Sequence, residues 1–139
     1  MKNRGIEISQ YQGGGYKPMV DYESWRVAVL RYCNELLPSE ICKMQRHDKT
    51  DEVFVLLNGS CILFSAGNED EIQEISAVNM EPFKLYNVKK GVWHTHTLGK
   101  DAEVLIIENQ DTSLVNSPEK ALGKRHQETI VNLSKELWK

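Results

Sequence analysis

Apolar and polar residues alternate in short runs along most of the chain, and turn-forming residues separate the runs. A period of two is typical of strands that bury one face. The pattern predicts eight strands, over residues 25–33, 41–47, 52–59, 60–67, 71–78, 83–91, 92–98 and 103–109. So many short strands at close intervals predict an all-β sandwich or barrel.

One turn in this series has a clear sequence signal of its own. Asn58 and Gly59 stand between an apolar run of Val, Phe and Leu residues, which ends at Leu57, and the next apolar run. Both residue types tolerate positive φ, as the tight turns of hairpins require. The pair therefore predicts a β-hairpin that joins the runs 52–59 and 60–67.

The C-terminal segment has apolar residues at helical spacing instead. Ile130, Leu133, Leu137 and Trp138 lie on one stripe, which predicts a helix over residues 124–137. The apolar side of such a helix must be covered, either by the open end of the barrel or by a second subunit.

The N-terminal residues 1–15 are polar and end in the stretch QGGG, which predicts a flexible arm. A chain of 139 residues is long enough to bury one core. The predicted organisation is therefore an arm over 1–15, a single β-barrel domain over 16–112 and a helical segment over 113–139.

Charge and composition argue against several classes of partner. The net charge is −3 with both signs interspersed, so no nucleic acid is expected to bind. The start MKNRGIEISQ lacks the apolar core of a signal peptide, and no stretch approaches the roughly 20 apolar residues of a membrane span, so no membrane partner is expected. Cys33, Cys42 and Cys61 each lie in a strand-like apolar segment, which predicts buried free thiols in a reducing cytoplasm.

Metal-competent side chains gather in two of the predicted strand regions. Gln45 and His47 share one face of a strand, Glu52 follows a short polar loop, and His94 and His96 again share a face. If the barrel brings these strands together, the side chains converge on one interior. Two imidazoles and a carboxylate suit Zn(II), Fe(II), Mn(II) or Ni(II), and three protein ligands leave positions open for water or substrate.

The residues around His47 resemble the first sequence motif of the cupin superfamily. That motif has a His-x-His pair, a glutamate after three or four residues and a glycine six residues later. Here Gln45-Arg46-His47 is followed at those spacings by Glu52 and Gly59, with Gln45 in place of the first histidine.

The residues around His94 resemble the second cupin motif, in which Pro-x-Gly precedes a ligand histidine by two residues. The stretch KKGVWH supplies Gly91 and His94, while Lys89 replaces the proline and Leu98 stands in place of the closing asparagine. The likeness to the superfamily covers roughly residues 25–110.

The resemblance implies a single-domain jelly-roll barrel, or double-stranded β-helix, with a divalent metal on His47, Glu52 and His94. An amide oxygen is a weak metal ligand, so Gln45 is expected to hold a ligand or a metal-bound water by a hydrogen bond. The stretches QRH and GVWHTH also resemble those of ureidoglycolate lyases, although TDEVF departs from that family at Glu52. This looser likeness implies a small carbon-acid or sugar-like substrate.

These features leave the function open between an enzyme and a binding protein. A metal acting as Lewis acid, with His96 moving a proton, would suit an isomerase, epimerase or lyase for a small sugar or carboxylate. Fe(II) would instead suit a dioxygenase. The alternative is a non-catalytic cupin that binds a metabolite without an obligatory metal, with Gln45 and Trp93 as ligand-binding candidates. Trp93 has the alternative role of a core aromatic.

Assembly is predicted from the strand that begins at Glu52. Val53, Val55 and Leu57 alternate with the predicted inward positions and make the outer face of this strand apolar. An apolar outer face is a liability in a monomer, which predicts a homodimer. The N-terminal arm and the C-terminal helix are the elements expected to cross between subunits.

Overall fold

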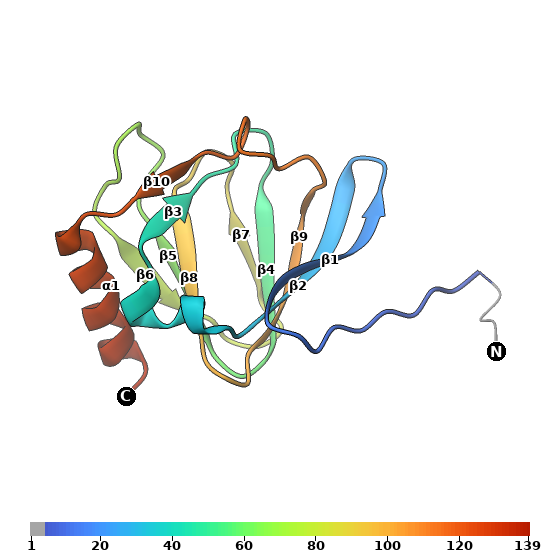
Figure 1. Cartoon of the computed structure of the whole chain (residues 1–139), viewed down its shortest axis with the longest axis horizontal. Coiled ribbons are helices and arrows are strands. Elements are labelled where there is room, and N and C mark those ends of the chain that lie inside the picture. The colour runs from blue at the N-terminus through green and yellow to red at the C-terminus, as the bar shows by residue number, and fades with distance from the viewer. Residues whose placement is uncertain (1–4) are drawn as a thin grey trace.

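Two antiparallel β-sheets pack face to face, and one helix lies against the outside of one of them (Figure 1). The structure, a computed structural model, describes residues 5–139. The first sheet contains, in spatial order, β1 (Gly15–Tyr22), β2 (Trp25–Arg31), β9 (Glu103–Asn109), β4 (Glu52–Asn58) and β7 (Leu85–Val88). The second sheet contains β10 (Glu119–Ala121), β3 (Lys43–Gln45), β8 (His94–Leu98), β5 (Cys61–Ser65) and β6 (Ser76–Asn79). The predicted jelly-roll barrel is confirmed.

Apolar side chains that alternate along the strands fill the space between the sheets. Phe54 and Leu56 point inward from β4, and Val104 and Ile106 point inward from β9; each is at most 1% exposed. The intervening residues of both strands are less buried and face outward. The two-residue period seen in the sequence therefore marks the core correctly.

Two strands, β1 and β10, were not expected from the sequence. β1 is an edge strand, and its register with β2 shifts between Pro18 and Val20. Proline cannot donate a backbone hydrogen bond and is tolerated at such an edge. β10 is only three residues long and pairs with β3, Glu119 opposite Gln45. Within the predicted arm, residues 1–4 lie outside the described residues, and 5–14 form neither helix nor strand.

The prediction of a β-hairpin at Asn58-Gly59 is wrong. β4 pairs with β7 and β9, whereas β5 pairs with β6 and β8, so the turn carries the chain from one sheet to the other. Gly59 has φ +75°, and an added Cβ would lie 2.6 Å from the backbone nitrogen of Ala102. Glycine is therefore required at this turn between the two sheets, because the backbone has a positive φ and lies close to the loop that contains Ala102.

The helix α1 (Lys124–Leu137) has the predicted bounds. Ile130 and Leu133 pack with Ile62 and Phe64, which face outward from β5 in the second sheet. Figure 1 shows the helix lying along this outer side of the sheet. The helix thus covers a face of its own chain, and the expectation that it closes the barrel end or crosses to a second subunit is corrected. Among residues 5–139, no helix is long and apolar enough to cross a membrane.

The three cysteines are free, but their burial differs from the prediction. Cys61 is buried between the sheets, Cys33 is half-buried and Cys42 is exposed. Cys42 precedes β3, and the buried residues of this segment are Ile41 and Met44 on either side of it. The buried and exposed residues of the segment 41–44 therefore do not alternate, and the sequence pattern does not reveal this break.

Candidate metal centre

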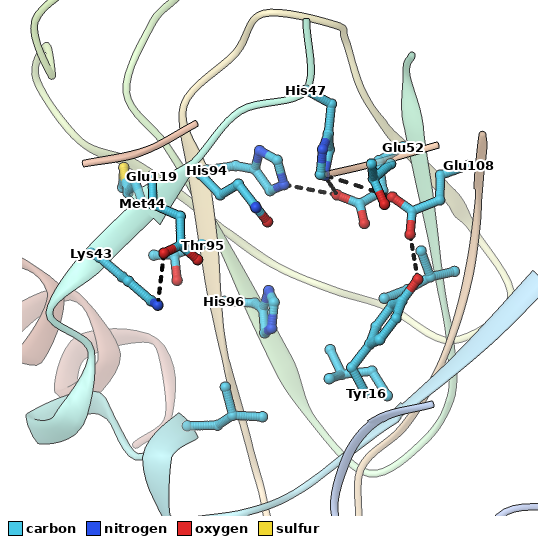
Figure 2. A pocket seen from close by; sticks show the side chains of 15 residues that line it. Tyr16, Lys43, Met44, His47, Glu52, His94, Thr95, His96, Glu108 and Glu119 are labelled. Carbon is cyan, nitrogen blue, oxygen red and sulfur yellow. Dashed lines mark hydrogen bonds and ion pairs between the residues drawn. The ribbon is translucent and has the colours of Figure 1, made fainter. Parts of the chain in front are cut away.

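The side chains of His47, Glu52 and His94 meet in the cavity between the two sheets (Figure 2). Glu52 Oε1 lies 3.1 Å from His47 Nε2 and 2.8 Å from His94 Nε2. All three residues are buried, at most 6% exposed, and their candidate ligand atoms lie within 4.8 Å of one another. Ligand atoms around one ion with bonds of about 2.1 Å lie roughly 3.0–3.4 Å apart, so the cluster has the size of a metal site.

Backbone pairing brings the two sequence motifs to this point. Gln45 of β3 pairs with His94 of β8, which aligns the first motif with the second. The backbone N–H of Gly91 donates to the carbonyl of His47 at 2.7 Å. Gly91 has φ +82°, a conformation that glycine adopts without strain. The glycine of the second motif thus fixes the loop that carries the ligand histidine of the first.

Both imidazoles are held in the tautomer that metal binding requires. His94 Nδ1 lies 2.9 Å from the carbonyl of Val92, which can only accept, so the proton is on Nδ1. His47 Nδ1 lies 2.7 Å from the hydroxyl of Ser117, whose own proton goes to the side-chain oxygen of Asn116 at 3.0 Å. In this neutral tautomer each ring turns the lone pair of Nε2 toward Glu52. Without a metal, a second proton on Nε2 lets the ring donate to Glu52 Oε1 instead. Outer partners of this kind commonly orient metal-ligating histidines.

Burial and charge compete in setting the protonation of the cluster. Burial raises the pKa of Glu52, but its hydrogen bonds with His47 and His94 outweigh burial and lower the pKa below its ordinary value. Burial lowers the pKa of His47, but the hydrogen bond and charge of Glu52 outweigh this and raise it above 6.5. The site therefore strongly favours a positive charge next to the Glu52 carboxylate.

A second buried carboxylate, Glu108 of β9, lies beside this cluster and was missed in the sequence. Its Oε1 is 3.6 Å from His47 Nε2, and its Oε2 accepts a hydrogen bond from the Tyr16 hydroxyl at 2.5 Å. Burial and the charge of Glu52 raise the pKa of Glu108 to about 7. Alternation with Val104 and Ile106 was the available signal, because it places Glu108 on the inward face of the strand.

The cavity is about 360 Å³ in volume, and both His96 and Gln45 line it. His96 Nδ1 is buried without a hydrogen-bond partner among the described residues, and burial lowers the pKa of His96 to about 4. The Gln45 side-chain N–H₂ donates to the carbonyl of Ser117 at 3.1 Å. The structure therefore brings five of the six predicted site residues, His96 and Gln45 with the three candidate ligands, to one cavity.

Trp93 is the sixth, and it lies outside the residues that line this cavity. It packs in the cluster under α1, and its indole N–H donates to the carbonyl of Glu69 at 2.8 Å. The guanidinium of Arg46 lies over the ring, 4.8 Å from its centroid. Trp93 precedes His94 directly and so faces the opposite side of the sheet, which agrees with its alternative role as a core aromatic.

Solved structures are similar to this chain in fold. The capsular polysaccharide assembling protein CapF from Staphylococcus aureus matches 88% of this chain and 34% of its own length, at 16% identity and a TM-score of 0.53. A protein from Planctomyces limnophilus matches 84% of this chain and 92% of its own, at 12% identity and a TM-score of 0.50. A cupin-2 domain protein from Shewanella frigidimarina covers 73% and 85%, at 16% identity and a TM-score of 0.49.

No protein-family model matches the sequence, and no curated protein matches it either. At the identities found among solved structures, the likeness concerns the fold alone. Its agreement with the two five-stranded sheets and with the two motifs that meet in one cavity leads to a single conclusion: the chain has the cupin fold.

Proposed function

We propose that the chain binds a divalent metal ion through His47, Glu52 and His94 and uses it to act on a small oxygen-rich metabolite. One observation carries the proposal: the Nε2 atoms of two imidazoles lie 3.1 and 2.8 Å from one carboxylate oxygen, and all three atoms lie within 4.8 Å of one another. Three electron-rich atoms held this closely need protons or a cation between them. Imidazole nitrogen and carboxylate oxygen are the donors of Zn(II), Fe(II), Mn(II) and Ni(II) sites.

A bound metal would supply Lewis-acid polarisation of a substrate carbonyl or hydroxyl. His96 supports proton-transfer chemistry beside it, because its side chain lines the same cavity, its ring is neutral at physiological pH and its Nδ1 has no hydrogen-bond partner among the described residues. Gln45 has its N–H₂ group tied to Ser117, which leaves the amide oxygen for a substrate hydroxyl. Proton transfer next to a polarised carbonyl is the chemistry of isomerases, epimerases and lyases.

The charges in the cavity favour a neutral substrate over an anionic one. Carboxylates of Glu52, Glu108 and Glu119 line it, and the ammonium of Lys43 is already paired with Glu119 at 3.0 Å. A divalent ion would offset two of these charges. We therefore propose a sugar-like polyol or carbonyl compound as the substrate class, ahead of a carboxylate.

Elemental analysis tests the metal proposal directly. The protein is purified without added metal and without a chelating affinity tag, and bound metal is measured per chain. We expect close to one ion per chain, lost in His47→Ala and in His94→Ala. His126→Ala is the matched control, because it removes a half-buried imidazole of α1 that does not line the cavity. A metal-free wild-type protein after incubation with Zn²⁺, Mn²⁺, Ni²⁺ and Fe²⁺ would contradict the proposal.

The second candidate is a non-catalytic cupin that binds a metabolite without a metal. Gln45 favours it, since this side chain replaces a ligand histidine and is held to a backbone carbonyl. This candidate predicts that sugar binding survives chelation and the substitution His94→Ala. Iron as the ion found in elemental analysis would instead favour dioxygenase chemistry, because two histidines and a carboxylate leave positions for O₂.

The outer face of the first sheet supports the proposal of a homodimer. Two apolar rows cross its strands: Val20, Val27, Ile107 and Val53 form one, and Val29, Leu105, Val55 and Leu85 form the other. No helix covers this face in residues 5–139, in contrast to the second sheet. A face without charged side chains in its centre fits a second copy of itself better than a charged partner.

Sedimentation of wild type and variants tests the homodimer. Val55→Lys places a charge in the middle of the apolar rows and is expected to convert dimers into monomers. Val78→Lys is the control, because Val78 is an exposed valine of the second sheet. A wild type that sediments as a monomer would contradict the proposal of a homodimer.

We propose the cytoplasm as the compartment of the protein, and the three free cysteines support it.

A further inference from the structure

We infer that Glu108 is a fourth protein ligand of the metal, in place of the histidine that the first cupin motif has where this chain carries Gln45. The inference rests on the proposed metal function. It goes beyond that proposal because Glu108 belongs to neither motif and lies on β9, a strand that the motifs do not include.

The carboxylate of Glu108 is buried, and only one of its two oxygens accepts a hydrogen bond. Its side chain is 3% exposed. Oε2 accepts the hydrogen bond from Tyr16, whereas Oε1 has no hydrogen-bond partner among the described residues. A buried carboxylate oxygen without a partner is costly and calls for an explanation. Figure 2 shows Glu108 between Glu52 and Tyr16, beside the histidine cluster.

Strand register places Glu108 opposite Glu52. Val53 of β4 pairs with Ile107 of β9, so the next step along both strands sets Glu52 against Glu108 on the inward face. Like charges directly opposite each other on neighbouring strands are destabilising, and burial strengthens the repulsion. A cation between the two carboxylates would convert this repulsion into attraction.

The position of the free oxygen fits a ligand to the same ion. Oε1 of Glu108 lies 3.6 Å from His47 Nε2, close to the separation expected of two atoms that share one metal. Tyr16 fixes the other oxygen and thereby orients the carboxylate toward the cluster. Two carboxylates and two neutral imidazoles also give a divalent ion a site of zero net charge, which suits burial.

Titration with Co²⁺, added alone as a spectroscopic probe, tests the inference. Binding is followed by the visible absorption of Co²⁺ and by competition with a chelator. Glu108→Gln keeps the shape of the side chain and is expected to raise the Kd for Co²⁺ at least about tenfold. The absorption spectrum of bound Co²⁺ should change as well, because its coordination changes.

Glu119→Gln is the matched control, because it removes another carboxylate of the cavity, one that pairs with Lys43 away from the cluster. Its Kd is expected to stay within about twofold of wild type. Equal Kd values and spectra for wild type and Glu108→Gln would overturn the inference and leave the proposed function standing. Absence of Co²⁺ binding to wild type would overturn both.

Glu108→Asp keeps the negative charge but withdraws the carboxylate by one methylene. If Glu108→Gln does not fold, Glu108→Asp is titrated with Co²⁺ in its place. A raised Kd with a changed spectrum supports ligation by Glu108, and an unchanged Kd overturns it.

Discussion

The two sheets contribute different chemistry to the cavity between them. The first sheet supplies the carboxylates of Glu52 and Glu108 and the hydroxyl of Tyr16, and the second supplies the imidazoles of His94 and His96. His47 joins them from the loop that leaves β3. The candidate metal centre is thus a product of sheet packing, since Glu52 comes from the first sheet and His94 from the second.

The sheets differ equally on their outer sides. The helix α1 covers the second sheet, and the buried Ile130 fixes it there. The first sheet has half-buried valines and isoleucines but no cover from its own chain in the described residues. The sheet that carries His94 and His96 is therefore covered by α1 on its outer face. The sheet that carries Glu52 and Glu108 would be covered only by the second copy in the proposed homodimer.

Ile130→Ala tests the covered face and has the largest expected effect. Ile130 is 0% exposed, so the cavity left by the substitution should cost about 2–5 kcal/mol in the free energy of unfolding. Ile107→Ala, on the uncovered face, should cost less because Ile107 is only half-buried. Urea unfolding at a concentration where sedimentation shows monomers measures both, and equal losses would contradict the contrast.

Glu52→Gln tests the carboxylate that both imidazoles face. Glutamine keeps the shape but lacks the charge, so we expect the Kd for a divalent metal to rise at least about a hundredfold, or about 2.7 kcal/mol. Circular dichroism should show an unchanged fold, since the core around Phe54 is untouched. Metal affinity equal to wild type would show that the ion, if bound, lies elsewhere.

The pH dependence of metal binding follows from the raised pKa of His47. Its Nε2 must be free of a proton to bind a metal, and the raised pKa of His47 means that protons compete for this atom at higher pH than for an ordinary imidazole. The affinity should therefore fall as pH decreases from 8 to 6, by up to about tenfold per pH unit for each proton displaced.

The stability of the metal-free protein should change with pH in the direction opposite to the metal affinity, and decrease as pH rises. A raised pKa contributes stability at low pH that is lost as pH rises through the folded value, and this holds for His47 and for Glu108, whose pKa is about 7. The difference in Tm between metal-loaded and metal-free protein should therefore widen from pH 6.5 to pH 8. A constant difference over this range would contradict displacement of a proton by the metal.

Ser117→Ala tests the support on the imidazole side. Without the hydroxyl, His47 Nδ1 loses the acceptor that fixes its tautomer, and the Kd for metal should rise about tenfold. Ser134→Ala is the control, because Ser134 is an equally buried serine whose hydroxyl donates within α1. Equal effects of the two substitutions would mean that Ser117 acts on stability alone.

The sequence predicted those parts of the fold in which local pattern and tertiary structure agree. The bounds of α1 and the buried positions of β4 and β9 follow directly from periodicity. β1 was missed because Pro18 and its polar neighbours suit only an edge. The residues at Asn58-Gly59 predict a hairpin wrongly, because local residues encode the turn but not the strand with which each neighbouring strand pairs.

The site was predicted as far as motif spacing reaches. His47, Glu52 and His94 were identified because their spacing to Gly59 and Gly91 is itself the signal. Glu108 has no motif around it, and its closeness to Glu52 depends on the pairing of β4 with β9, which sequence alone does not give. Trp93 was predicted either as a core aromatic or as a ligand-binding residue, and its place under α1 agrees with the first alternative, as its parity with His94 also indicates.

Tyr16→Phe has the smallest expected effect and compares support on the carboxylate side with that of Ser117. The substitution removes only the hydrogen bond to Glu108 Oε2. Tyr16 belongs to an edge strand and is 40% exposed, so water can replace its hydroxyl, whereas the buried Ser117 has no such replacement. We expect the Kd for Co²⁺ to rise about threefold, less than in Ser117→Ala, if outer partners act by fixing their ligands. Tyr22→Phe, on the outer face of β1, is the control. A larger rise in the Kd for Co²⁺ in Tyr16→Phe than in Ser117→Ala would mean that the orientation of the Glu108 carboxylate, and not that of the His47 imidazole, limits metal binding.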